Sequence, residues 1–212
     1  MKFYPITFSP ILKDRIWGGT KLKTYLHKNS DSQTTGESWE ISTVTGDISV
    51  VNSGLLEGKN INEIIELYPE EILGKSVIDQ FGKQFPLLFK FIDAKEDLSI
   101  QLHPNDELAK ERHNSFGKTE MWYVMQADAE ARLVVGFKKN SNQNEYLEAL
   151  ENKNLVSLLN EYPVKQGDVF FLETGTIHAI GAGVVVAEIQ QTSDITYRIY
   201  DWDRVDANGN GR

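Results

Sequence analysis

The chain of 212 residues contains no cysteine, which excludes both a disulfide framework and a thiolate metal site. No run of lysine and arginine is long enough to follow a phosphate backbone, and the net charge of -9 argues against a nucleic-acid surface. No stretch approaches the ~18 consecutive apolar residues of a membrane span. Met1–Pro5 also lacks the apolar core of a signal peptide. We therefore expect a soluble, cytoplasmic protein that binds neither nucleic acid nor a membrane.

Short apolar segments separated by turn residues dominate the sequence and predict a mainly β fold. Strands are predicted near residues 37–42, 49–51, 85–93, 98–103, 120–126, 131–137, 168–172, 184–190 and 194–200. Helical segments are predicted near 60–80, 105–113 and 143–160, and a capping box between Asn60 and Glu63 opens the first of them. No βαβ rhythm suggests a parallel sheet. We expect one domain over residues 1–212, with its strands in a sandwich or a small barrel.

The segment Leu98–Pro104 carries the most informative pattern. Its apolar residues alternate with Ser99, Gln101 and His103, as the two-residue period of a strand requires. One strand face can therefore pack into a core. The other presents a hydroxyl, an amide and an imidazole, each about 7 Å from the next. A polar face of this kind inside a β protein is either solvated or built to hold a ligand.

Four histidines are present, and their surroundings differ. His27 lies in a polar stretch and is expected on the surface, and His113 is expected at the solvated end of a short helix. His103 lies on the polar strand face, and His178 heads an apolar strand. The last two are the candidates for a site.

Glu120 opens a strongly apolar strand, where a half-buried carboxylate must be paired with a cation such as Lys118 or bound to a metal. Two imidazoles, one carboxylate and the amide oxygen of Gln101 suit a borderline divalent ion such as Zn²⁺, with positions open for water or substrate. We therefore expect about one ion per chain.

The segment that ends at His178 resembles the second sequence motif of the cupin superfamily. Gly167, Gly175 and His178 keep the spacing of that motif, whereas Glu173 replaces its proline and Ala182 replaces its asparagine. The resemblance implies a cupin-type (jelly-roll) β-barrel with helical insertions.

A wider set of segments resembles the type I mannose-6-phosphate isomerases, in their short bacterial form. The first cupin motif is altered there to Gln-x-His followed by a displaced glutamate, as in Gln101, His103 and Glu120. The other segments that carry the resemblance are Ile16–Gly19, Gly36–Ser42, Leu88–Lys90, Lys118–Tyr123, Gly175–Ala179 and Tyr197–Trp202. Together they cover nearly all of the chain.

This resemblance implies a set of site residues and a reaction. The zinc ligands of the family match Gln101, His103, Glu120 and His178. Its catalytic arginine matches Arg198, and its active-site glutamate matches Glu188. Family positions linked to substrate or phosphate contact match Ser99 and Lys118. The implied reaction interconverts mannose 6-phosphate and fructose 6-phosphate through a cis-enediol. The proton-transfer group stays open between Lys118, Glu188 and a metal-held water.

Other interpretations remain for this site. If the strands at 184–190 and 194–200 are antiparallel neighbours, Glu188 and Arg198 share a pocket. The alternative is that these two residues form only a cross-strand ion pair. Two other function classes also remain: a sugar-phosphate-binding or regulatory cupin without turnover, and a different metal-dependent cupin enzyme such as an Fe²⁺ oxygenase.

Members of this family are normally longer and carry a further C-terminal β domain, which we expect to be absent from residues 1–212. The metal site should nevertheless be complete, because all its candidate residues precede position 199. We expect Asp206–Arg212 to form a loop, since glycine and asparagine favour turns. If the further domain covers part of the barrel, this chain exposes an apolar patch and associates weakly with itself; otherwise it is a monomer.

Overall fold

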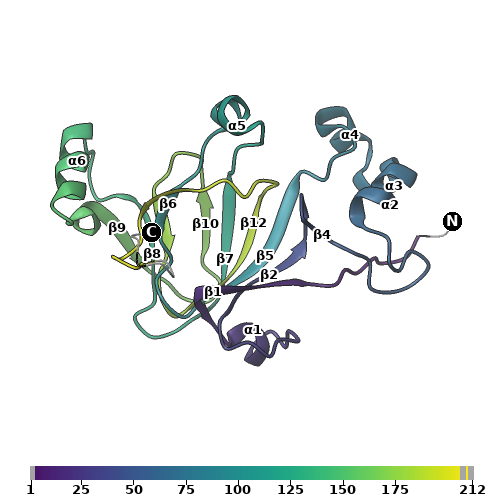
Figure 1. Cartoon of the computed structure of the whole chain (residues 1–212), viewed down its shortest axis with the longest axis horizontal. Coiled ribbons are helices and arrows are strands. Elements are labelled where there is room, and N and C mark those ends of the chain that lie inside the picture. The colour runs from purple at the N-terminus through teal and green to yellow at the C-terminus, as the bar shows by residue number, and fades with distance from the viewer. Residues whose placement is uncertain (1–2, 206–208, 210–212) are drawn as a thin grey trace.

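The computed structural model describes residues 3–205 and 209, and two antiparallel sheets form its centre (Figure 1). The larger sheet has six strands in the order β1-β2-β5-β12-β7-β10. Its strands are β1 (Ile11–Gly19), β2 (Thr35–Ile41), β5 (Leu87–Ala94), β12 (Val184–Gln191), β7 (Glu120–Ala127) and β10 (Val169–Leu172). The mainly β fold with helical insertions is therefore confirmed.

The smaller sheet has five strands in the order β13-β6-β11-β8-β9. Its strands are β13 (Tyr197–Tyr200), β6 (Ile100–Leu102), β11 (His178–Ile180), β8 (Arg132–Phe137) and β9 (Leu159–Pro163). A separate short hairpin joins β3 (Thr43–Val44) to β4 (Asp47–Ile48). The two large sheets form the walls of the jelly-roll. Among the described residues, no pair of hydrogen-bonded strands joins one sheet to the other.

The main core lies between the two sheets. Val124 of β7 and Val184 of β12 are fully buried and pack in one cluster with Leu133 of β8 and Ile180 of β11. These side chains belong to alternate positions of their strands, so the neighbouring positions face outward. Burial of this apolar surface holds the two sheets face to face.

A helical lobe flanks the end of the larger sheet, at the right of Figure 1. It contains α2 (Ile61–Leu67), α3 (Pro69–Leu73) and α4 (Lys75–Phe81). The predicted capping box is present: the Asn60 side chain accepts from the Glu63 N–H, and the Glu63 side chain accepts from the Asn60 N–H. Ile61, Ile64 and Ile65 bury one face of α2 and form a second, separate core.

Three more helices lie outside the sheets: α1 (Lys21–Thr24), α5 (Asp106–His113) and α6 (Gln143–Glu151). The helix predicted over 143–160 is too long, because α6 ends at Glu151. A 3-10 turn at Leu155–Leu158 and strand β9 follow it. Leu155 and Leu159 are buried in a core cluster with the smaller sheet, so tertiary packing decides the structure here.

The predicted strands differ from the structure at several other places. Residues 49–51 make only isolated bridges, and the strand predicted at 194–200 begins at Tyr197. Strand β1 was not predicted, because its charged residues hide the alternation. The loop predicted at Asp206–Arg212 lies almost wholly outside the described residues. No helix in the described part of the chain has the length and hydropathy needed to cross a membrane.

Candidate metal centre and active-site pocket

Three buried side chains from three different segments meet between the sheets. His103 follows β6, Glu120 begins β7 and His178 begins β11. His103 Nε2 lies 3.2 Å from Glu120 Oε1, and His178 Nε2 lies 3.6 Å from Glu120 Oε2. Each residue offers one potential ligand atom, and these three atoms lie within 4.8 Å of one another. All three side chains are at most 2% exposed. This cluster can hold a metal ion.

The turn before β11 brings the two histidines together. Gly175 has a φ of 81°, a conformation that glycine adopts without strain. Its N–H donates to the carbonyl oxygen of His103 at 2.8 Å, which ties the turn to the end of β6. The spacing between Gly175 and His178, which matches the cupin motif, therefore has a local geometric reason in this chain.

Backbone carbonyls orient both imidazoles toward Glu120. His103 Nδ1 lies 3.0 Å from the Ile195 oxygen, and His178 Nδ1 lies 2.8 Å from the Thr176 oxygen. Each Nδ1–H donates to its carbonyl, so each Nε2 keeps its lone pair for a ligand. His178 Nε2 and both Glu120 oxygens are buried and make no hydrogen bond of normal geometry. Buried acceptors left in this state fit a bound cation.

The surroundings of the cluster favour an ionised Glu120 and a neutral His178. Burial acts to raise the pKa of Glu120, but Lys118 and His103 outweigh burial and hold it well below its usual range. Lys118 Nζ lies 2.9 Å from Glu120 Oε1 and 3.3 Å from His103 Nε2. Burial lowers the pKa of His178 to about 4. A deprotonated carboxylate and neutral imidazoles are the forms that bind a metal.

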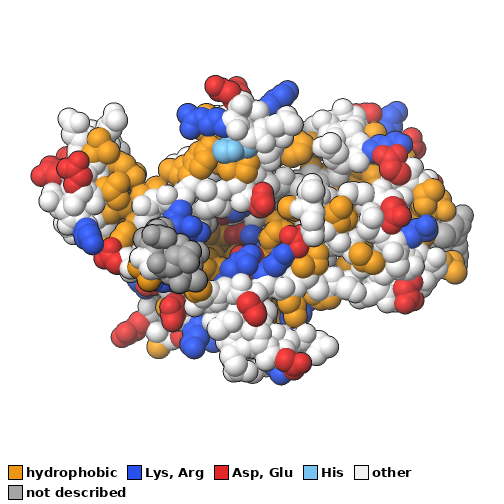
Figure 2. All heavy atoms as spheres, viewed as in Figure 1, with side chains coloured by type: hydrophobic (Ala, Val, Ile, Leu, Met, Phe, Trp, Pro, Cys, Tyr) orange, Lys and Arg blue, Asp and Glu red, His pale blue; other side chains and the backbone are white. Residues whose placement is uncertain are grey.

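A polar pocket of about 500 Å³ opens beside this cluster. Figure 2 shows the hollow in the middle of the face, with basic and acidic side chains inside it. Ser99, Gln101 and Lys118 line it, so three of the residues predicted from the sequence connect the cluster to the pocket. Ser99 Oγ donates to Gln101 Oε1 at 3.5 Å, and Gln101 lies opposite His178 on the neighbouring strand.

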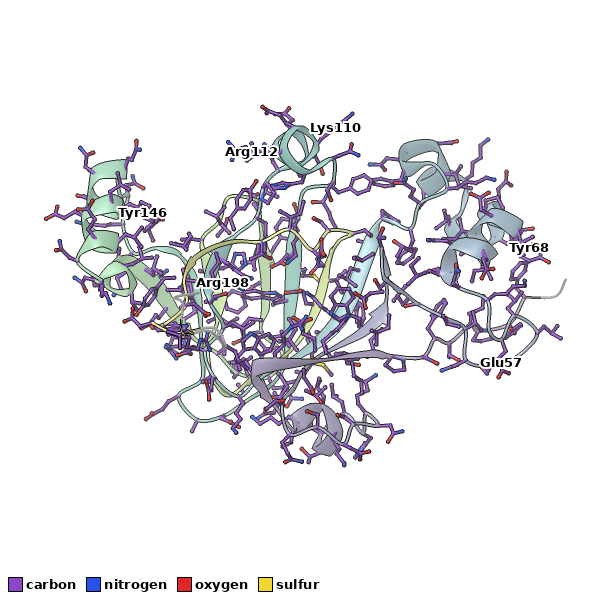
Figure 3. The ribbon with its side chains drawn as sticks, viewed as in Figure 1. Glu57, Tyr68, Lys110, Arg112, Tyr146 and Arg198 are labelled. Carbon is purple, nitrogen blue, oxygen red and sulfur yellow. The ribbon has the colours of Figure 1, made fainter. Side chains whose placement is uncertain are left out.

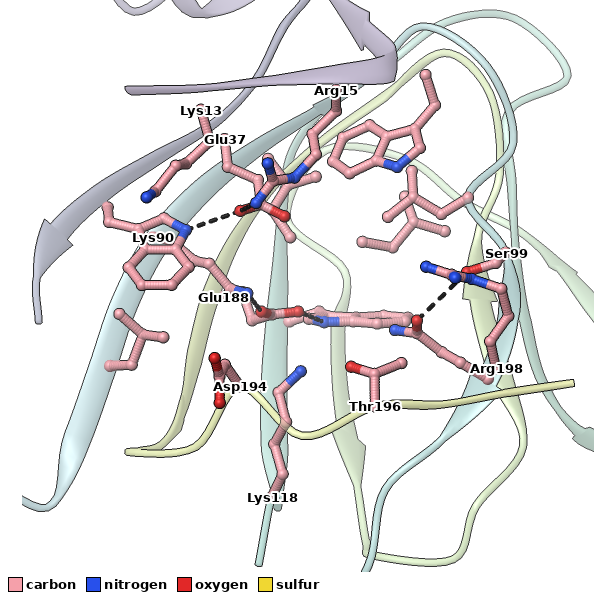
Figure 4. Close-up of a pocket in the computed structure, with 18 of the residues that line it drawn as sticks. Lys13, Arg15, Glu37, Lys90, Ser99, Lys118, Glu188, Asp194, Thr196 and Arg198 are labelled. Atoms are coloured by element: carbon pink, nitrogen blue, oxygen red, sulfur yellow. Dashed lines mark hydrogen bonds and ion pairs between the residues drawn. The ribbon is translucent and has the colours of Figure 1, made fainter. Parts of the chain in front are cut away.

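Glu188 and Arg198 line the same pocket but come from different sheets (Figure 4). They share the pocket although their strands are not neighbours, because β12 lies in the larger sheet and β13 pairs with β6 in the smaller one. No ion pair joins them. Glu188 Oε1 instead lies 2.8 Å from Lys90 Nζ, and Glu188 Oε2 accepts from Trp122 Nε1 at 2.6 Å.

Arg198 is exposed on the pocket wall formed by the smaller sheet. Figure 3 places it between the sheets, whereas Lys110 and Arg112 on α5 point away from the molecule. No described residue forms an ion pair or hydrogen bond with its guanidinium. Arg198 is therefore available to an anionic or developing negative charge in the pocket.

One wall of the pocket, formed by β1 and β2, was not expected from the sequence. Lys13, Arg15 and Trp17 alternate along β1 and line the pocket, as does Glu37 of β2. Glu37 Oε2 accepts from Arg15 Nη2 at 3.0 Å, and Lys13 pairs with Asp47. The two-residue spacing of Lys13, Arg15 and Trp17 is the sequence feature that could have indicated this wall. A solvated strand has the same alternation of polar residues, so the spacing alone does not identify a pocket.

One row of side chains crosses the inner face of the larger sheet. Ladder pairing places Trp39 opposite Lys90, Lys90 opposite Glu188, and Glu188 opposite Trp122. Burial acts to lower the pKa of Lys90, but Glu188 and Glu37 outweigh it and raise the pKa above its usual value. Lys90 is therefore a fixed cation in the pocket.

Both remaining histidines lie away from the cluster. His27 is exposed, and exposed His113 ends α5 with its Nε2 2.8 Å from the Tyr197 hydroxyl oxygen.

The two-sheet fold and the buried histidine–glutamate cluster beside a polar pocket define a cupin-type protein with a candidate metal centre. The model of the family "phosphomannose isomerase type I, catalytic domain" matches residues 6–155. The chain belongs to the type I phosphomannose isomerase family.

Individual relatives agree with this assignment. The mannose-6-phosphate isomerase ManA of Bacillus subtilis is 40% identical over 206 residues, which cover 97% of this chain and 63% of that protein. The crystal structure of the mannose 6-phosphate isomerase from Bacillus subtilis aligns with a TM-score of 0.89 at 38% identity, covering 98% of this chain and 65% of that one.

A crystal structure of mannose 6-phosphate isomerase bound with zinc and yttrium aligns with a TM-score of 0.70 at 19% identity. The alignment covers 92% of this chain and 70% of that one, and this likeness concerns the fold alone. The chain spans less than two thirds of the length of its Bacillus relatives.

Proposed function

We propose that this chain carries the catalytic centre of an isomerase that interconverts mannose 6-phosphate and fructose 6-phosphate. The observation that supports it most is the buried cluster of His103, Glu120 and His178, which Lys118 connects to a pocket lined by Arg198. Membership of the type I phosphomannose isomerase family supports the same reaction. The pocket volume of about 500 Å³ is within the range of small-molecule sites.

His103, Glu120 and His178, together with Gln101, would hold one Zn²⁺ ion per chain. Their nitrogen and oxygen donors suit this borderline ion, and the unsatisfied buried atoms of Glu120 and His178 fit a cation. When bound, the ion would polarise oxygen atoms of the substrate as a Lewis acid. The remaining chemistry belongs to side chains of the pocket.

Arg198 would stabilise the negative charge that develops on the enediol oxygens, because its guanidinium reaches the pocket without a protein partner. Ser99 and Lys118 would bind the substrate, the hydroxyl as a hydrogen-bond donor and the ammonium as a point charge. Both side chains are buried to 7% exposure or less, so their positions are fixed by packing.

The reaction removes the proton at C2 of the aldose and returns it at C1. Lys118 Nζ and Glu188 Oε1 are the two side-chain atoms that we propose as its carriers, since both residues line the pocket. Lys90 would hold the Glu188 carboxylate in place through its 2.8 Å contact. We place the protein in the cytoplasm, where phosphorylated sugars are retained by their charge.

A coupled assay that follows fructose 6-phosphate formation from mannose 6-phosphate, with zinc-loaded protein, tests this function. We expect turnover that does not depend on oxygen. Binding of mannose 6-phosphate without turnover would instead identify a sugar-phosphate-binding cupin. Oxygen consumption with an Fe²⁺-loaded protein would identify an oxygenase. The His113→Ala variant, changed at an exposed histidine outside the cluster, serves as the active control.

A further inference from the structure

The backbone of Thr119, the residue after Lys118, is held by a glutamine of the neighbouring strand. The ladder between β7 and β12 ends where Glu120 lies opposite Gln190. One residue further, Gln191 continues the pairing with its side chain. Thr119 N–H donates to Gln191 Oε1 at 2.8 Å, and Gln191 N–H donates to the Thr119 carbonyl oxygen at 3.1 Å. Both backbone hydrogen-bonding groups of Thr119 are therefore bound to Gln191.

The residue before Lys118 is held in a similar way by α5. Gly117 N–H donates at 2.8 Å to Oδ1 of Asp106, the first residue of that helix. A Cβ atom on Gly117 would lie 2.6 Å from the Asp106 nitrogen, so a glycine is required for the backbone to rest this closely on the helix. The Lys118 N–H itself donates to the Pro104 carbonyl oxygen at 3.2 Å. Three consecutive N–H groups around Lys118 therefore have fixed partners.

Asp106 and Gln191 also bind each other. Gln191 Nε2 donates to Asp106 Oδ1 at 3.2 Å. Asp106 begins α5 and Gln191 ends β12, so this hydrogen bond joins the helical insertion to the larger sheet beside the Lys118 segment. Neither side chain is among the described residues that line the pocket. Any effect of the pair on a ligand in the pocket must therefore pass through the segment that the pair holds.

That segment decides where the Lys118 ammonium lies. The Lys118 side chain is buried, and Figure 4 shows it extending from its strand into the pocket. Its Nζ lies 2.9 Å from Glu120 Oε1 and 3.3 Å from His103 Nε2. A buried side chain has few conformations open to it, so a shift of its backbone moves the charged end as well.

We propose that Asp106 and Gln191 are positioning residues, which place the Lys118 ammonium for the reaction from outside the pocket. This inference rests on the proposed function, in which Lys118 binds the substrate and is one of the two proton carriers. Both roles require the ammonium at a defined place. A displacement of about 1 Å at a reacting group can cost about 10²-fold in rate, so residues that only hold the backbone affect turnover.

Steady-state kinetics with mannose 6-phosphate on the zinc-loaded chain test the proposal. Gln191→Met removes the side-chain hydrogen bonds to Thr119 and Asp106, and we expect kcat/KM to fall by roughly 10- to 100-fold with unchanged zinc content. Asp106→Ala should act in the same direction. Asp106→Asn keeps an acceptor oxygen for the Gly117 N–H and should restore most of the activity that Asp106→Ala loses.

Gln126→Met is the matched control. Gln126 also donates from its amide to a carboxylate, Asp128 Oδ1, at 2.7 Å, but it lies at the other end of β7. This variant should keep the kinetics of the parent.

A double-mutant cycle with Lys118→Arg separates positioning from a merely structural role. Lys118→Arg keeps a cation beside Glu120. Adding Gln191→Met to it should cause almost no further loss of kcat/KM, because a residue that acts through Lys118 has no effect once the lysine is gone. Losses that multiply in the double variant overturn the proposal. Parental kinetics of Gln191→Met overturn it, and so does loss of zinc from that variant.

Failure of the proposed function gives a different result. If the parent binds mannose 6-phosphate without turnover, the isomerase assignment fails, and the same cycle is measured through the dissociation constant by titration calorimetry. Non-additive weakening of binding then supports the positioning role of Gln191, and unchanged or additive effects overturn it. A parent chain that neither binds nor converts mannose 6-phosphate overturns both proposals.

Discussion

At the scale of single residues, the candidate metal centre consists of ionisable groups that are almost completely buried. Glu120 is 1% exposed, and the compensating charge at hydrogen-bond distance is the ammonium of Lys118. His178 is buried and neutral, with its Nε2 directed at Glu120. Burying such groups is unfavourable unless they are paired or bind a metal. Such buried groups are therefore expected where a protein binds a metal ion.

Removing one imidazole should release the metal. We expect His103→Ala and His178→Ala to lose most of the bound zinc, because each takes away a ligand from a small set of donors. Elemental analysis of gently purified protein measures this, and His113→Ala, changed at an exposed histidine, should keep its zinc. Full zinc content in both cluster variants would contradict the ligand assignment.

Replacing Arg198 should affect turnover and not metal content. We expect Arg198→Lys to lower kcat by roughly 10²–10³-fold, because an ammonium does not reproduce the guanidinium fork at the developing charge. Steady-state kinetics with mannose 6-phosphate, together with zinc analysis, check this. Arg112→Lys, changed at an exposed residue on α5, is the control. Near-parental turnover of Arg198→Lys would give Arg198 a structural role only.

At the scale of elements, the inner face of the larger sheet carries a charged row instead of apolar residues. Lys90 and Glu188 face each other across β5 and β12, with Trp39 and Trp122 on their outer sides. Lys90 and Glu188 are at most 7% exposed, so neither charge is solvated. The pairing register of β5 and β12 therefore places the charges of Lys90 and Glu188 next to each other in the pocket.

This buried pair should be strongly coupled. We expect Lys90→Met alone to lower the free energy of unfolding by roughly 3–5 kcal/mol, because it leaves the charge of Glu188 uncompensated. The double variant Lys90→Met/Glu188→Leu should be less destabilised than the sum of the single variants. Urea unfolding measures these effects. The exposed pair Lys83–Glu66 is the control, because its nitrogen–oxygen distance is also 2.8 Å. Lys83→Met should change the free energy of unfolding by less than about 1 kcal/mol.

At the scale of the whole molecule, the residues of the candidate metal centre come from both sheets. Glu120 belongs to β7 of the larger sheet, whereas His178 belongs to β11 and His103 follows β6 of the smaller sheet. An ion bound to all three would connect the walls of the jelly-roll. Metal binding should therefore stabilise the fold as well as the site.

Chelation should lower the midpoint of thermal unfolding, and added zinc should restore it. A free ion at 100 times its dissociation constant stabilises the native state by about 2.7 kcal/mol. Differential scanning calorimetry in chelator, and again after zinc is added, measures the shift. The His178→Ala variant should show almost no response to either treatment. An equal response in parent and variant would show that the ion acts elsewhere.

The sequence by itself determined the local features of this protein. The alternation in Leu98–Pro104 and the capping box at Asn60 depend on neighbouring residues, so they could be predicted without the fold. The cupin spacing of Gly175 and His178 is local as well. Gln101, His103, Glu120 and His178 were named through their types and spacing together with the family resemblance.

Only the tertiary structure decided which strands share a sheet and which charges meet. It separated Glu188 from the strand of Arg198 and paired it with Lys90, and it made Lys13 and Arg15 part of the pocket wall. It also ended α6 at Glu151 by burying Leu155 and Leu159 against the smaller sheet. Strand pairing and burial depend on contacts between residues far apart in the chain. A local sequence pattern does not predict those contacts.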